Sequence, residues 1–200
     1  MYIGENFNVR FHDIFRFWKL LENNSSCGIL HSEFIPNKNF RNMMISRSAQ
    51  KIRDVPNAGG NSVISEVLSF EFLNKAVQAQ LLKTEMEVTY FPEGGSITDY
   101  VCTISKQKVG VSVTRAMKYR GQYTEEDVHH LLTKKLKGVI QSTKNSMEKW
   151  SKQILHIWTP NKHTTNTIAM VYYQLPDNIR SNTVVIVTTS DHSSYIYKNG

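Results

Sequence analysis

Two acidic residues, Glu66 and Asp99, lie where they could take part in chemistry, and the pattern around Glu66 predicts limited contact with water. Glu66 falls in a segment whose apolar residues recur at helical spacing, and on a wheel of 100° per residue it lies inside the apolar stripe. A carboxylate removed from water without a partner is costly. Glu66 is therefore either paired with a lysine or a helix cap, or it faces a metal or a substrate. Asp99 lies in the second of three runs that alternate apolar and polar residues, a pattern typical of strands.

The segment Thr84–Arg115 must position Asp99, and its pattern predicts a three-stranded meander. A simple hairpin across the turn Pro92–Ser96 would place Glu85, Glu87 and Asp99 on one face of the sheet. That face is either a polar surface or a set of ligands. Carboxylates bind hard cations such as Mg²⁺, which in phosphodiester cleavage activate water and neutralise the leaving oxygen.

The elements around the meander follow from apolar spacing and helix caps. We expect a helix from Asn61 or Ser62 to about Leu82, the meander, a helix from Glu125 to about Gln141, a strand over Gln153–Trp158, a crossover helix over Thr165–Leu175 and a strand over Asn182–Thr189. This order predicts the α/β class, with a mixed central sheet and helices on both faces.

The pattern before residue 58 is different. Phe11–Glu22 carries one apolar helical stripe, whereas Ile29–Pro56 is irregular, with basic residues spread through it. That segment is either a nucleic-acid arm or a solvated connector. We therefore expect residues 1–57 to form an N-terminal helical extension with a basic connector, and residues 58–200 to form the α/β domain. The tail after Thr189 is expected to form an edge strand or to fray.

Three polar residues in the predicted helices have an ordinary structural interpretation. Glu71 lies at the edge of its apolar stripe and is expected to be solvated. His129 and His130 are adjacent, so they point in different directions and do not form a metal pair on one helix face. They are expected to lie on the helix surface.

Composition favours an anionic partner. The 200 residues include 24 Lys and Arg against 17 Asp and Glu, which gives a net charge of +7, and the pI is near 9.4. Such a charge favours nucleic acid as a partner. Cys27 and Cys102 are far apart in sequence and indicate neither a disulfide framework nor a cysteine zinc site.

Targeting signals are also lacking in the sequence. No apolar run reaches the roughly 20 residues that span a bilayer. The first residues do not have the basic-then-apolar order of a signal peptide. We therefore expect an intracellular protein, cytoplasmic or nuclear, with no membrane partner, and the sequence does not indicate its oligomeric state.

The common nucleotide and hydrolase motifs are absent: the chain has no G-x-x-x-x-G-K-S/T loop, no G-x-G-x-x-G after a strand, no G-x-S-x-G and no H-E-x-x-H. The chemistry that the sequence favours is therefore a carboxylate metal site.

The element order and these acids resemble the PD-(D/E)XK nuclease superfamily, whose restriction-endonuclease-like core is a helix, a three-strand meander, a helix and a strand. The resemblance covers about residues 59–158. It implies that Glu66 on the first helix and Asp99 in the second strand bind Mg²⁺ or Mn²⁺. The family's third-strand E-x-K triplet is replaced by Ser112-Val113-Thr114. The resemblance then implies substitutes, with Glu87 as a third metal ligand and Arg115 or Lys118 as the catalytic cation.

Three functions follow from these residues. The first is a divergent metal-dependent nuclease-like protein that acts on or binds nucleic acid. The second is a catalytically inactive protein of the same fold that serves as a nucleic-acid or protein binding module. In the third, Glu66 and Asp99 pair with core lysines or arginines and the domain is structural, since perturbed acids also occur in structural networks.

Overall fold

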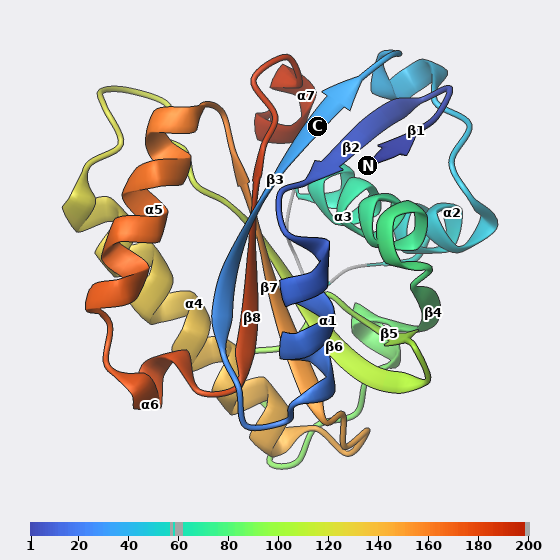
Figure 1. Ribbon diagram of the computed structural model, residues 1–200. Coiled ribbons are helices and arrows are strands. Elements are labelled where there is room, and N and C mark those ends of the chain that lie inside the picture. The colour runs from blue at the N-terminus through green and yellow to red at the C-terminus, as the bar shows by residue number, and fades with distance from the viewer. Residues whose placement is uncertain (57, 59–61, 199–200) are drawn as a thin grey trace.

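Eight strands form one mixed sheet in the order β1-β2-β3-β8-β7-β6-β5-β4 (Figure 1). The structure is a computed structural model that describes residues 1–56, 58 and 62–198. The strands are β1 Tyr2–Ile3, β2 Phe7–Phe11, β3 Gly28–Pro36, β4 Gln80–Thr84, β5 Tyr100–Ile104, β6 Gln107–Arg115, β7 Lys152–Thr159 and β8 Thr183–Thr189. The α-helices are α1 Ile14–Glu22, α2 Arg47–Asp54, α3 Val63–Val77, α4 Glu125–Asn145, α5 Lys162–Gln174, α6 Asp177–Arg180 and α7 Ser194–Tyr197, and the short 3₁₀ helices are η1 Phe40–Asn42 and η2 Glu85–Glu87.

The centre of the sheet is parallel and its two sides are antiparallel. Strands β3, β8, β7 and β6 pair in parallel, while β1-β2-β3 and β4-β5-β6 pair antiparallel. The parallel strands are connected through helices, as parallel pairs require. The predicted mixed α/β class is confirmed.

Helices cover both faces of this sheet, as predicted. α1 and α3 pack on one face, and α4 and α5 pack on the other (Figure 1). Alternation along the central strands separates two cores: Ile154 and Ile186 face α3, whereas Leu155 and Val187 face α4 and α5. Strands buried on both faces are apolar along their whole length, which explains the continuous apolar run of β8.

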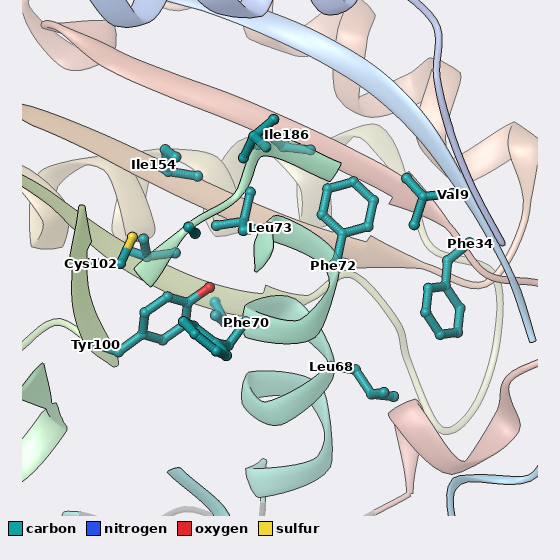
Figure 2. Packing of buried hydrophobic residues seen from close by; sticks show 14 of the residues in the cluster. Val9, Phe34, Leu68, Phe70, Phe72, Leu73, Tyr100, Cys102, Ile154 and Ile186 are labelled. Atoms are coloured by element: carbon teal, nitrogen blue, oxygen red, sulfur yellow. The ribbon is translucent and has the colours of Figure 1, made fainter. Parts of the chain in front are cut away.

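Helix α3 is the central element of its face. Its buried residues extend almost around its circumference, because it packs against the sheet and against α2 and α7. Phe70 and Phe72 lie between the helix and side chains of the sheet such as Tyr100 (Figure 2). The helix ends at Val77, where Gln78 takes a left-handed conformation with φ 58°. It is therefore shorter than predicted, because the residues from Gln80 onward pair with β5.

The start of α3 is described only in part. Ser62 is its N-cap residue but makes no capping bond through its side chain. The alternative predicted cap, Asn61, lies outside the described residues. Extended backbone at the cap is the usual arrangement, and Ser62 instead uses its hydroxyl to bind Glu66.

The order helix, three-strand meander, helix, strand is present as α3, β4-β5-β6, α4 and β7. The predicted first strand is displaced, however. Thr84 pairs with Tyr100, and Glu85–Glu87 forms η2, stabilised by a capping box between Thr84 and Glu87. The simple hairpin is therefore wrong, and a long connection joins β4 to Asp99.

The N-terminal segment is not a helical extension. Its strands β1, β2 and β3 belong to the same sheet as the rest of the chain, and β3 pairs in parallel with the central strand β8. The segment expected to be an irregular connector contains β3 and α2. These residues were not recognised because β3 depends on long-range pairing rather than on a strong local pattern. The expected boundary at Asn57 lies outside the described residues.

The second half of the chain agrees more closely with its local signals. Thr124 and Asp127 form the predicted capping box of α4. The predicted strands and crossover helix are present as β7, β8 and α5, and His129 and His130 are exposed. The tail differs, because Ser194–Tyr197 forms the short helix α7 rather than an edge strand or a frayed end.

A chain of hydrogen-bonded polar side chains crosses the core between α3 and the sheet. His156 of β7 is fully buried, with Nδ1 2.7 Å from Ser69 Oγ and Nε2 2.7 Å from Thr188 Oγ1. Ser69 continues to the hydroxyl of Tyr100 at 2.8 Å, and Thr188 continues to Ser32 at 2.7 Å. Burial lowers the pKa of His156 to about 3, so the imidazole is neutral.

Candidate functional site

Glu66 lies in the first turn of α3 and is buried, with 5% of its surface exposed. The hydroxyl of Ser62 donates to Glu66 Oε1. The same turn is fixed to the sheet, because Trp158 Nε1 donates to the carbonyl of Ser65 at 3.0 Å. The position of Glu66 on the core side of the helix is therefore confirmed, and its carboxylate is held by a short local contact.

Asp99 precedes β5 and continues its pairing with β6. Its backbone N donates to the carbonyl of Val111 at 3.1 Å, and its Oδ2 accepts from the backbone N of Val113 at 2.7 Å. Because β6 extends beyond the start of β5, the N–H of Val113 has no carbonyl of β5 opposite it. The carboxylate takes that place, which fixes Asp99 on the sheet and leaves its second oxygen, Oδ1, for another contact.

The two carboxylates are close enough for their charges to interact. Burial is the largest cause that raises the pKa of Asp99, and the charge of Glu66 is the second. The hydrogen bond from Val113 and the charge of Lys135 act in the opposite direction. Two carboxylates at one site disfavour ionisation of both, and a cation between them removes this penalty.

Further polar groups line the same region. Tyr90 accepts from the backbone N of Thr98 at 2.8 Å, and burial raises the pKa of Tyr90 to about 12. Glu85 accepts from the backbone N of Ala58 at 2.7 Å and also contributes to raising the pKa of Asp99. The local field is therefore negative, and Lys135 is the cation that lowers the pKa of Asp99.

The third strand supplies hydroxyls beside Asp99. Thr98 Oγ1 donates to the carbonyl of Val111 at 3.0 Å and lies 3.4 Å from the hydroxyl of Ser112. Neutral hydroxyls bring neither negative charge to a metal nor positive charge to a phosphate. Any charge needed beside Asp99 must come from residues other than these hydroxyls.

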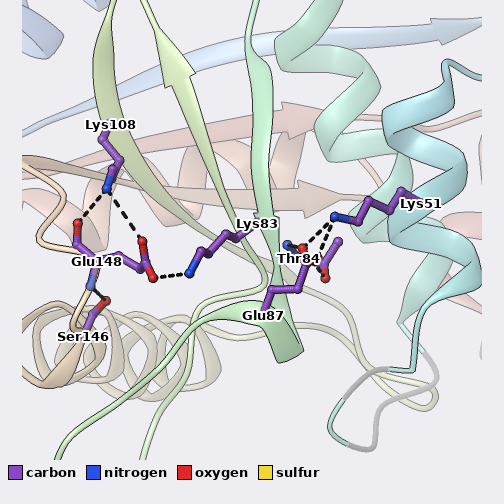
Figure 3. Close-up of polar contacts among 7 residues, drawn as sticks. All are labelled: Lys51, Lys83, Thr84, Glu87, Lys108, Ser146 and Glu148. Carbon is purple, nitrogen blue, oxygen red and sulfur yellow. Dashed lines mark hydrogen bonds and ion pairs between the residues drawn. The ribbon is translucent and has the colours of Figure 1, made fainter.

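Glu87 is not part of this cluster. It lies in η2, is exposed, and binds Lys51 Nζ through both of its oxygens at 2.6 and 2.8 Å (Figure 3). It also accepts from the backbone N of Thr84 at 2.9 Å. The proposed ligand role of Glu87 depended on its being in a strand next to Asp99. The 3₁₀ turn removes that alternation and directs Glu87 toward α2.

Arg115 is the last residue of β6 and Lys118 follows the strand, and their side chains contact different parts of the molecule. Arg115 Nη1 donates to the carbonyl of Ile196 in α7 at 3.3 Å. Lys118 Nζ lies 2.6 Å from Asp127 Oδ2 at the start of α4. Lys118 lowers the pKa of Asp127 to about 2, so this pair belongs to the cap of α4.

The donor set suits a metal bound mainly by water. Within residues 1–56, 58 and 62–198, no group of three or more acids, histidines or cysteines is placed to hold a metal ion. The predicted set of Glu66, Glu87 and Asp99 is thus not assembled. The pair Glu66 and Asp99 matches the one or two carboxylates that Mg²⁺ uses when water and phosphate oxygens complete its shell.

Lys135 was not singled out from the sequence, although a signal was present. It lies seven residues after Val128, which places it on the same helix face two turns later. Val128 belongs to the buried stripe of α4. A charged residue within an apolar stripe is the same signal that identified Glu66, and the charge of Lys135 acts on Asp99 from α4.

The fold and the acid pair together define an α/β protein with a helix, meander, helix, strand core and a two-carboxylate site. No protein-family profile matches the chain. The chain is 43% identical over 162 residues to the AAC-rich mRNA clone AAC4 protein of Dictyostelium discoideum, across 77% of this chain and 24% of that protein. The chain therefore spans about a quarter of the length of this curated relative.

One solved structure is also similar. The structure of Pyrococcus furiosus SfsA in complex with Ca²⁺ matches 64% of this chain and 55% of its own, with 16% sequence identity and a TM-score of 0.33. None of the described helices is long and apolar enough to cross a membrane.

Proposed function

We propose that this chain is a divergent metal-dependent nuclease-like protein that acts on nucleic acid, with Glu66 and Asp99 holding one Mg²⁺ or Mn²⁺. The observation that carries the proposal is the pair itself. Two carboxylates from separate elements, α3 and the start of β5, are brought close enough for one charge to raise the pKa of the other. A site that concentrates negative charge in this way favours a bound cation.

The residues have distinct roles in this proposal. Glu66 and Asp99 supply hard oxygen ligands, and the bond from Val113 orients the Asp99 carboxylate. A divalent cation there would supply water activation and charge neutralisation at a phosphodiester. Lys135 provides positive charge that acts on Asp99 from outside the third strand, and it is suited to orient a phosphate oxygen. Arg115 and Lys118 remain predicted catalytic residues, but their contacts to Ile196 and Asp127 make them weaker candidates than Lys135.

Calorimetric titration of the purified chain with Mn²⁺ and Mg²⁺ tests the metal site. We expect Asp99→Asn and Glu66→Gln each to weaken Mn²⁺ binding at least tenfold, since each removes one of two charged ligands. Glu87→Gln is the matched control, because it removes an acid at an ion pair outside the site. Equal losses in all three variants, or no metal binding by the native chain, would refute the assignment.

Cleavage is measured separately, with single-stranded and duplex DNA and RNA in the presence of Mn²⁺. The proposal predicts activity that Asp99→Asn abolishes. Activity that survives Asp99→Asn would show that another site is responsible.

The second candidate is a catalytically inactive binding module of the same fold. The observation that favours it is the third strand, where Ser112 and Thr114 occupy the positions of an acid and a lysine. This candidate predicts nucleic-acid binding without cleavage, with an affinity that falls as salt rises because phosphate contacts release counterions. Salt-dependent binding together with no turnover on any of the substrates would support it over the first.

A further inference from the structure

A cavity of about 680 Å³ lies beside the first turn of α3 and is separate from the carboxylate pair. Its lining comes from three elements, η1, α3 and α7, and consists of Asn39, Phe40, Arg41, Asn42, Ile64, Tyr195 and Lys198. The volume falls within the roughly 300–1,000 Å³ typical of small-molecule sites. It is large enough for one nucleotide unit.

Two aromatic rings form one part of this cavity. Phe40 and Tyr195 lie with ring centroids 6.3 Å apart and an interplanar angle of 29°. Both side chains are only partly buried. Aromatic faces of this kind are the surfaces on which single-stranded nucleic acids stack their bases, and such stacking does not depend strongly on base identity.

Two cations form the rim. Arg41 and Lys198 are exposed, and neither is ion-paired with any residue in the described part of the chain. The combination of unpaired positive charge and aromatic faces matches a phosphate next to an unpaired base. The amides of Asn39 and Asn42 add donors and acceptors suited to base edges.

The cavity and the acid pair share one helical turn. Ile64 lines the cavity and Glu66 follows two residues later. Residues two apart on a helix point about 200° apart. The two sites therefore lie on different sides of the same turn, separated by about a helix diameter of ~10 Å. Arg115, the last residue of β6, donates to the carbonyl of Ile196, the residue after Tyr195, so the end of β6 is attached to α7 beside the cavity.

We propose that this cavity binds an unpaired nucleotide of a single-stranded nucleic acid, with its base against Phe40 or Tyr195 and its phosphate at Arg41 and Lys198. The inference rests on the proposed function for its substrate class and extends it to the form of the substrate. A base within a duplex is already stacked on its neighbours, so the cavity selects single strands. The strand then continues past the first turn of α3 toward Glu66 and Asp99.

Fluorescence anisotropy with a labelled 12-nucleotide single strand and the full chain, in buffer with EDTA, tests the proposal without metal. We expect Phe40→Leu to weaken binding about tenfold, since a stacked base contributes ~1–3 kcal/mol and each 1.4 kcal/mol is tenfold. We expect Arg41→Gln to weaken binding and to reduce the slope of log K against log salt by about one.

Matched controls use sites at a distance from the cavity. Phe15→Leu removes an exposed ring on α1, and Lys144→Gln removes an exposed charge in the last turn of α4. Because α4 connects the parallel strands β6 and β7, its C-terminal end lies at the opposite end of the sheet from α7 (Figure 1). Both controls should leave affinity within about twofold. Equal losses in controls and cavity variants would overturn the proposal, as would equal competition by duplex or no binding of any oligonucleotide.

Substitution of the acid pair distinguishes a failure of the cavity proposal from a failure of the proposed metal site. Asp99→Asn should retain single-strand binding in EDTA while losing Mn²⁺ binding. If the cavity variants bind normally but the metal titration succeeds, only the cavity proposal fails. If the chain binds single strands at the cavity but binds no Mn²⁺, only the metal proposal fails.

Discussion

Two residues of α3 that are three positions apart enter opposite kinds of polar environment. Ser69 belongs to a buried row of hydrogen-bonded side chains that includes Tyr100, His156 and Thr188, and the groups in this row are neutral. The charge of Glu66 instead raises the pKa of Asp99, so like charges interact there. Neutral, mutually bonded groups stabilise a core, since each satisfies the next. Neighbouring like charges do not, and a buried Glu66 whose charge raises the pKa of Asp99 is a perturbation typical of functional sites.

The largest expected effect on stability comes from breaking the hydrogen bonds that Ser69 makes to His156 and Tyr100 in the core. Ser69→Ala leaves His156 Nδ1 and the Tyr100 hydroxyl without their shared partner, and each unsatisfied buried group costs about 1–3 kcal/mol. We expect the free energy of unfolding to fall by ~3 kcal/mol, measured by urea denaturation at pH 7. Ser142→Ala is the control, because Ser142 is equally buried but bonds only the carbonyl of Val139 in its own helix. Equal losses of unfolding free energy in the two variants would show that the hydrogen bonds between these side chains add no stability beyond that of a single buried hydroxyl.

Substitution of an acid of the pair should raise the free energy of unfolding at high pH, whereas substitution of Ser69 lowers it. The pKa of Asp99 is raised on folding, so its contribution to stability is fully present below its unfolded pKa of about 3.9 and is lost as the pH rises through the folded pKa. Asp99→Asn removes this pH-dependent loss of stability, because an amide does not ionise. We expect the variant to be more stable than the native chain at pH 9, by at least about 1.4 kcal/mol, the equivalent of one pKa unit.

Urea denaturation from pH 4 to pH 9 measures this effect. Addition of Mn²⁺ should restore stability to the native chain at pH 9 and leave Asp99→Asn unchanged. A native chain whose stability rises steadily over this range relative to Asp99→Asn would contradict the repulsion.

A smaller effect on the free energy of unfolding is expected at Glu87, the exposed acid. Glu87 pairs with Lys51 at the surface, and such pairs contribute about 0.2–1 kcal/mol. Glu87→Gln keeps an acceptor for the N–H of Thr84 and should reduce the free energy of unfolding by less than about 1 kcal/mol in urea denaturation. The loss should shrink at 1 M salt, since screening weakens a surface pair. A loss that does not change with salt would place the contribution of Glu87 in the η2 cap instead.

The smallest effect concerns Lys135. Its charge lowers the pKa of Asp99, so Lys135→Gln should raise that pKa further without changing the fold. Carbon-13 NMR of the Asp99 carboxyl across a pH titration measures the shift. Lys134→Gln, on an exposed side of the same helix, is the matched control. If the control shifts the Asp99 pKa as much, Lys135 has no special position at the site.

Local signals identified those parts of the fold that depend on neighbours in sequence. The capping box Thr124–Asp127, the apolar run of β8 and the apolar stripe of α3 each predict their element, and the stripe alone marked Glu66 as buried. Glu71 shows the limit of that method. It was expected to be solvated, but it is fully buried, and its Oε1 accepts from the backbone N of Ser46 because α2 packs on α3.

The sequence by itself indicated the α/β class, the order of elements from α3 to β8 and the burial of Glu66, whereas the role of Asp99 as a site residue stays a prediction that rests on a family resemblance. Periodicity and caps are properties of a few consecutive residues, and they are sufficient for these conclusions. Only the tertiary structure decided that β1–β3 complete the sheet, that Glu87 turns toward Lys51, that the charge of Lys135 acts on Asp99, and that Phe40 and Tyr195 line one cavity. These features depend on pairing and packing between distant segments, which no local pattern contains.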